Sequence, residues 1–126
     1  MGVTRQPSDF ATFSNAVAVE GPGKWIYISR QVAMGEDGRA IDGTVAEQTE
    51  AILDRIEELL GGDGAGLSHV VKITTYLKSL DEYSEFSRVR GERFGETLPA
   101  SAAFAVADLL AGAAIEIEAV AFVPAG

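Results

Sequence analysis

The segment that decides the fold is Ile115-Glu116-Ile117-Glu118-Ala119-Val120-Ala121, near the C-terminal end of the chain. Its residues favour strands, and side chains in a strand point alternately to opposite faces. Glu116 and Glu118 therefore share a face with Val120 and Phe122, while the isoleucines and alanines point the other way. Spacing leaves two interpretations of these carboxylates open. They line a solvated sheet face, or Glu118 acts as a general acid or base or positions a water molecule.

Two amphipathic helices are predicted before this strand. Thr44 and Glu47 have the spacing of a capping box, and apolar residues then recur at three- and four-residue steps. Ser79 and Glu82 repeat this spacing, and we expect the second helix to extend to about Phe94.

The remaining strands are predicted from their β-branched and aromatic residues, at 10–19, 25–28, 69–77 and 100–106. The first two read as a hairpin-like pair around Gly21-Pro22-Gly23, and Val71, Ile73 and Leu77 are expected on one face of the third. The order ββαβαββ predicts one α+β domain over residues 1–126, with both helices covering one face of a mixed sheet.

Composition excludes several classes of function. The chain has 126 residues, no cysteine and a single histidine, so disulfides and Cys-based metal sites are excluded and we expect no metal or cofactor. That histidine, His69, is expected at the surface or as a cap, and no serine-hydrolase triad is indicated. The formal charge of -9 disfavours nucleic acid and anionic membranes as partners. Without a signal-like or membrane-spanning apolar run, a cytoplasmic protein is expected.

One arginine stands out in the second helix. At 100° per residue, Arg90 lies within the arc of Tyr83, Phe86 and Phe94. A cation on an apolar face needs a partner. We expect Arg90 to form an internal ion pair with Glu116 or Glu118.

Four motifs resemble the Rid (YjgF/RidA, endoribonuclease L-PSP-like) family. Phe13 to Val17 is similar to Y-S-Q-A-V, Ile28 to Gln31 to T-S-G-Q, Val70 to Leu77 to V-V-K-T-T-V-Y-L, and Ile115 to Ala121 to I-E-I-E-A-I-A. Their order and span, from Phe13 to Val123, support the resemblance. It implies a chorismate-mutase-like fold, a homotrimer, and clefts between subunits in which small carboxylate-bearing enamines or imines are bound and hydrolysed.

The resemblance also assigns site residues. Glu118 matches the glutamate that orients the hydrolytic water, and Ser101 stands where the motif P-x-R has the arginine that clamps the substrate carboxylate. The substrate-binding candidates are Ser101, Arg30, Phe13, Ser29 and Ser87, of which Phe13, Arg30 and Ser87 replace the tyrosine, glycine and asparagine of the family. Ordinary 2-aminoacrylate deamination is therefore not expected.

Two functions remain open on this basis. Glu118 favours a hydrolase of the deaminase type. Its substrate would be an imine, enamine or related reactive intermediate whose substrate tail differs from that of the family's usual substrates. Ser101 favours a non-catalytic trimer that binds a small metabolite. Arg30 or Arg90 is a possible replacement for the missing clamp, with Arg30 the expected ligand anchor and Arg90 the expected structural residue. Ribonuclease activity is disfavoured by the charge and the absence of a histidine pair.

Overall fold

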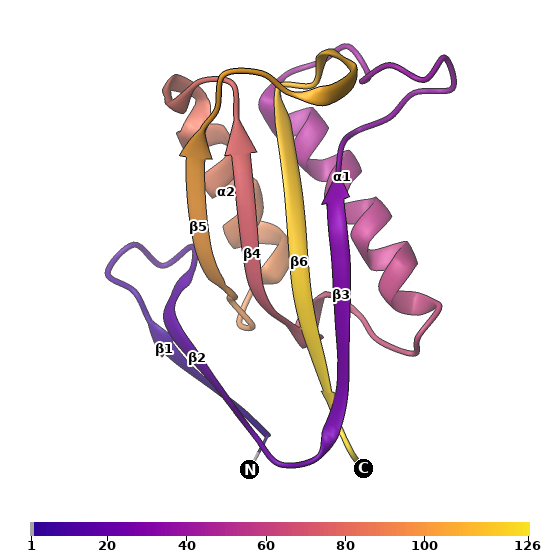
Figure 1. Cartoon of the computed structure of the whole chain (residues 1–126). Helices are drawn as coiled ribbons and strands as arrows, with labels where there is room; N and C mark the ends of the chain where they lie inside the picture. Colours follow the sequence, from indigo (N-terminus) through magenta and orange to yellow (C-terminus); the bar gives the residue numbers. More distant parts are fainter. Residues whose placement is uncertain (1) are drawn as a thin grey trace.

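The computed structural model describes residues 2–126 and has a sheet of six strands with two helices on one face (Figure 1). The strands lie in the order β1-β2-β5-β4-β6-β3. Their bounds are β1 Gly2–Pro7, β2 Ser14–Glu20, β3 Gly23–Gln31, β4 Val70–Leu77, β5 Ala100–Ala105 and β6 Ile115–Pro124. The sheet is mixed, because β4 runs parallel to β5 and antiparallel to β6. This confirms the predicted fold class.

The helices are α1, Val45–Gly61, and α2, Tyr83–Phe94. The capping box predicted for α1 is present, with Thr44 accepting from the Glu47 amide and Glu47 accepting from the Thr44 amide. Ser79 instead caps a short 3-10 turn, Leu80–Glu82, so the second predicted capping box is wrong. Because this turn comes first, α2 begins only at Tyr83. Between them, α1 and α2 cover the face of the sheet that carries the core (Figure 1).

Strand pairing differs from the expected hairpin. β2 pairs with β1, a strand not predicted from the sequence, and touches β5 at the single register pair of Ser14 with Ala100. β3 pairs with β6 at the opposite end of the sheet. As a result, β1 and β2 extend away from the main sheet as an arm (Figure 1). The two-residue break at 21–22 separates two strands that enter different parts of the sheet.

A β-bulge corrects one predicted face. The register of β4 with β6 shifts between Val70 and Lys72, which places Val70 in the core. Val71 instead lines an apolar groove with Val17 and Trp25. From Ile73 onward the alternation is as predicted, with Ile73 and Leu77 buried under the helices.

His69 has the expected capping role. Its Nδ1 accepts a hydrogen bond from the Gly66 amide at 3.0 Å, at the entrance to β4. No helix within residues 2–126 is long and apolar enough to cross a membrane.

Candidate functional site

The open face of the sheet, away from the helices, holds the first group of predicted site residues. Glu118 on β6 lies directly across from Thr74 on β4. Both line a hollow of about 300 Å³ together with Ser29 and Lys72. Two of the predicted site residues, Glu118 and Ser29, therefore line the same hollow. A carboxylate, two hydroxyls and an ammonium group around one hollow can hold a polar small molecule and a water.

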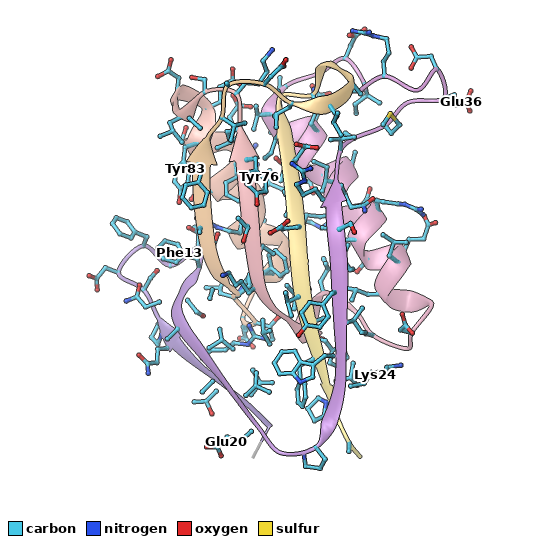
Figure 2. All side chains as sticks on the ribbon, in the orientation of Figure 1. Phe13, Glu20, Lys24, Glu36, Tyr76 and Tyr83 are labelled. Carbon is cyan, nitrogen blue, oxygen red and sulfur yellow. The ribbon has the colours of Figure 1, made fainter. Side chains whose placement is uncertain are left out.

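Tyr76 extends this group along β4 (Figure 2). Partial desolvation raises the pKa of its phenol, and the negative charge of Glu118 raises it further. The arginine at position 30 acts in the opposite direction, with its guanidinium carbon 5.9 Å from the centre of the Tyr76 ring. The phenol therefore stays protonated beside Glu118 and can donate a hydrogen bond.

The pKa of Tyr76 gives a pH-dependence that can be measured. In the unfolded chain the phenol ionises near its ordinary value of about 10, whereas the folded protein keeps the proton to higher pH. Stability is therefore expected to fall as the pH rises above about 10. The difference in tyrosinate absorbance between the parent and Tyr76→Phe reports the ionisation of Tyr76. We expect this ionisation at a pH above the ordinary pKa of tyrosine. Glu118→Gln should lower the pKa of Tyr76, because the negative charge beside the phenol is removed. An unchanged Tyr76 titration in this variant would contradict the coupling between Tyr76 and Glu118.

Arg30 lies near a carboxylate of its own chain. Its Nη1 lies 3.9 Å from Oε2 of Glu116, whose side chain is only 3% exposed. Both residues line a second hollow beside Asp108, at the end of β6. Arg30 thus forms a long ion pair with a buried carboxylate of its own chain while its side chain stays 53% exposed, and its role as the ligand anchor stays a prediction.

Arg90 is the centre of a second group, on the helix face. Its side chain is buried, and its Nη1 donates to Ser101 Oγ at 2.9 Å. Its Nη2 donates to Thr12 Oγ1 at 2.9 Å, to Tyr83 Oη at 3.0 Å and to Ser87 Oγ at 3.3 Å. The expected ion pair of Arg90 with Glu116 or Glu118 is wrong, because those carboxylates lie on the open face of the sheet. Arg90 bonds to neutral hydroxyls instead.

This cluster collects three of the predicted substrate-binding residues. Ser101 and Ser87 bond to the guanidinium, and the Phe13 ring centre lies 5.0 Å from its carbon atom. Figure 2 shows Phe13 and Tyr83 near β5, while Tyr76 lies over β4. Two members, Thr12 and Tyr83, were not predicted as site residues. Tyr83 shared a helical arc with Arg90 in the sequence, but nothing there indicated Thr12.

The two groups are separated by the sheet. Ser101 lies beside Ile73, whose side chain is in the core under the helices, whereas Glu118 lies beside Thr74 on the open face. A single chain therefore does not bring Glu118 and Ser101 into one pocket. Residues 2–126 also contain no group of three or more histidine, cysteine, aspartate or glutamate side chains placed to hold a metal ion.

Comparison with known proteins agrees with this architecture. The model of the family described as endoribonuclease L-PSP matches residues 3–123. A solved Rid-family protein from Yersinia pestis superposes with a TM-score of 0.79 at 25% identity, over 98% of this chain and all of the other. The chain belongs to the Rid family. RidA from an Antarctic Psychrobacter has a TM-score of 0.74 at 29% identity, over 94% of each chain.

Curated Rid-family relatives align over nearly their full lengths. A RutC family protein from Pyrococcus abyssi is 34% identical over 119 residues, which cover 94% of this chain and 91% of the relative. The human 2-iminobutanoate/2-iminopropanoate deaminase is 34% identical over 122 residues, covering 96% of this chain and 87% of the enzyme.

Proposed function

We propose that this Rid-family protein hydrolyses a small imine or enamine to the corresponding carbonyl compound and ammonia. The observation that carries the proposal is the placement of Glu118 in an open hollow with Ser29, Thr74 and Lys72. The names of similar proteins support it, since one of them is a deaminase of 2-iminobutanoate and 2-iminopropanoate.

Glu118 has a defined part in this chemistry. As the oxygen of water bonds to the imine carbon, its carboxylate accepts a proton from that water. The nitrogen takes up a proton as the carbon–nitrogen double bond becomes single, which gives the neutral carbinolamine. Glu118 then returns its proton to this nitrogen, the carbinolamine hydroxyl loses its proton as the carbonyl forms, and the carbon–nitrogen bond breaks to release ammonia. Thr74 and Ser29 supply hydroxyls that hold the water, and the protonated Tyr76 lies beside the same carboxylate.

A second copy of the chain completes the site in this proposal. Glu118 and Ser101 point to opposite faces of one sheet, so a pocket that uses both groups requires two subunits. We propose a homotrimer in which the open face of each copy lies against the next copy, on the side that carries Ser101. Large apolar side chains on or beside the open face support this assembly, because Trp25, Tyr27 and Phe104 are 46%, 75% and 52% exposed.

The assembly is tested by sedimentation at micromolar concentration, where we expect a trimer. Phe104→Glu should dissociate it, because a charge would be buried in the interface. Leu80→Glu is the matched control: Leu80 is 55% exposed, but it lies in the turn before α2, away from the open face. A monomeric parent would contradict the assembly and the shared site.

The activity is tested with an imine made in the assay. An amino-acid oxidase generates 2-iminobutanoate, and semicarbazide traps the fraction that has not yet been hydrolysed. The proposal expects less semicarbazone in the presence of the protein and faster release of ammonia. Equal amounts with and without the protein, for this imine and for a neutral imine, would reject the hydrolase.

A non-catalytic trimer that binds a small metabolite is the second proposal. The burial of Arg90, which is only 1% exposed, favours this proposal, because the hydroxyls of its own chain already occupy the guanidinium. Binding of a carbonyl compound without turnover of any imine would support it over the hydrolase.

A further inference from the structure

Arg90 is a buried cation without an anion. It is 1% exposed, yet none of the ion pairs formed within residues 2–126 includes it. By contrast, Arg93 on the same helix pairs with Glu50, Asp54 and Glu57 of α1. Buried charges in proteins are normally paired or bound to a ligand, because desolvation of a lone charge is costly. Arg90 is therefore the described cation that most needs an external anion.

The contacts of Arg90 solvate its charge without neutralising it. Four hydroxyl groups accept its hydrogen bonds, from Thr12, Tyr83, Ser87 and Ser101. Three aromatic rings lie within 5.5 Å of its guanidinium carbon, those of Phe13, Tyr83 and Phe86. The Nε atom is buried and has no hydrogen-bond partner. The Nε–H group of the guanidinium is thus left for a ligand.

The partners of Arg90 differ in how they are held. Tyr83 and Ser87 belong to α2 and Ser101 to β5, so these three are fixed by the helix and the sheet. Thr12 and Phe13 lie in the segment before β2, outside any helix or strand. Phe13 stacks on Phe10, which is 74% exposed, with ring centres 6.0 Å apart. This segment, Phe10 to Phe13, is the cover of Arg90.

The cover rests closely on α2. A Cβ atom at Gly91 would lie 2.9 Å from Cγ2 of Thr12, so the glycine is what allows the segment to approach Arg90. The volume next to the guanidinium that a ligand could occupy is the volume now filled by Thr12 and Phe13. Displacement of Thr12 would free an Nη2 donor while the hydroxyls of Ser87 and Ser101 stay in place.

We propose that Arg90 is the specificity-determining residue that binds the carboxylate of a small, planar monocarboxylate, and that the anion enters by displacing the cover. The planar guanidinium can pair bidentately with a carboxylate, and the surrounding hydroxyls can donate to its oxygens. The anchor thus comes from α2, and Ser101 contributes a hydroxyl beside it. The choice of a 2-oxo or 2-imino acid as ligand rests on the proposed function; the anion site itself does not.

The test uses 2-oxobutanoate and its neutral primary amide as probes of the assembled protein, by calorimetry and by the ¹⁵N–¹H signal of Arg90 Nε, assigned with Arg90→Lys. We expect the acid to bind at least roughly 30-fold more tightly than the amide, and to shift the Nε signal. Arg90→Met should lose the preference for the acid. Arg88→Met, on the exposed part of the same helix, should keep it, because Arg88 pairs only with Glu92 in the described chain.

A variant of the cover provides a test that keeps Arg90 intact. Thr12→Val removes the hydroxyl that competes for Nη2 while preserving side-chain shape. It should bind 2-oxobutanoate as tightly as the parent or more tightly, and the amide no better. Equal binding of acid and amide by the parent, or no binding of either, would overturn the anion site. Anion binding without imine turnover would support the anion site at Arg90 and reject only the hydrolase. Imine turnover without a preference for the acid would support the hydrolase and reject the anion site.

Discussion

Imine hydrolysis is expected to fall by about 10² to 10⁴ in Glu118→Gln, while the fold and the assembly remain intact. Glutamine has nearly the shape of glutamate, but its amide cannot accept a proton from the attacking water. The hollow around residue 118 is open, so the substitution does not leave a buried group without a partner. The loss should therefore appear in kcat and kcat/KM rather than in the melting temperature.

Glu116→Gln is the matched control for this prediction. Glu116 lies on the same strand and the same face, two residues away, but its carboxylate is buried and faces Arg30. Its replacement should affect stability more than turnover, because it leaves Arg30 without a counter-ion. Unchanged kinetics in a well-folded Glu118→Gln protein would remove Glu118 from the mechanism and favour the binding-only function.

The local elements were predictable because their signals are local. Alternation in the last strand placed Glu116 and Glu118 on one face, and the capping box of Thr44 and Glu47 placed the start of α1. The pairing of the strands was not predictable, because it depends on contacts between segments that are distant in the sequence. The short break before β3 suggested a hairpin, yet β3 pairs with β6. The bulge that turns Val71 away from the core has no signal in the alternation of its neighbours.

The site was predictable to a similar degree. The motif resemblance grouped Phe13, Ser87 and Ser101, and the structure brings all three to one guanidinium. The arginine at the centre was taken for a structural ion pair, because helical periodicity shows which face a residue occupies but not what lies opposite. The partner Thr12 is separated from Arg90 by 78 positions and belongs to a segment without periodicity. Tertiary placement of the loop was needed to find it.

The stability of Arg90 variants is the second large effect that we expect. Arg90→Ala should lower the free energy of unfolding by about 3 kcal/mol, because it empties a buried volume beside Phe86 and Phe13. It also removes the donor shared by four hydroxyls. Arg90→Met should cost only about 1 kcal/mol. Methionine refills much of the volume, and the hydroxyls of Thr12 and Ser87, 2.9 Å apart, already satisfy each other.

The difference between these two variants separates the hydroxyl cluster from a buried ion pair. If Arg90 neutralised a carboxylate, both substitutions would leave that charge buried and alone, at a cost of about 3 to 5 kcal/mol each. Urea denaturation at one fixed protein concentration measures both values, since assembly makes stability depend on concentration. Nearly equal, large losses would show an anion that pairs with Arg90 in the protein itself. A large loss for alanine and a small one for methionine would leave the charge of Arg90 free for a ligand.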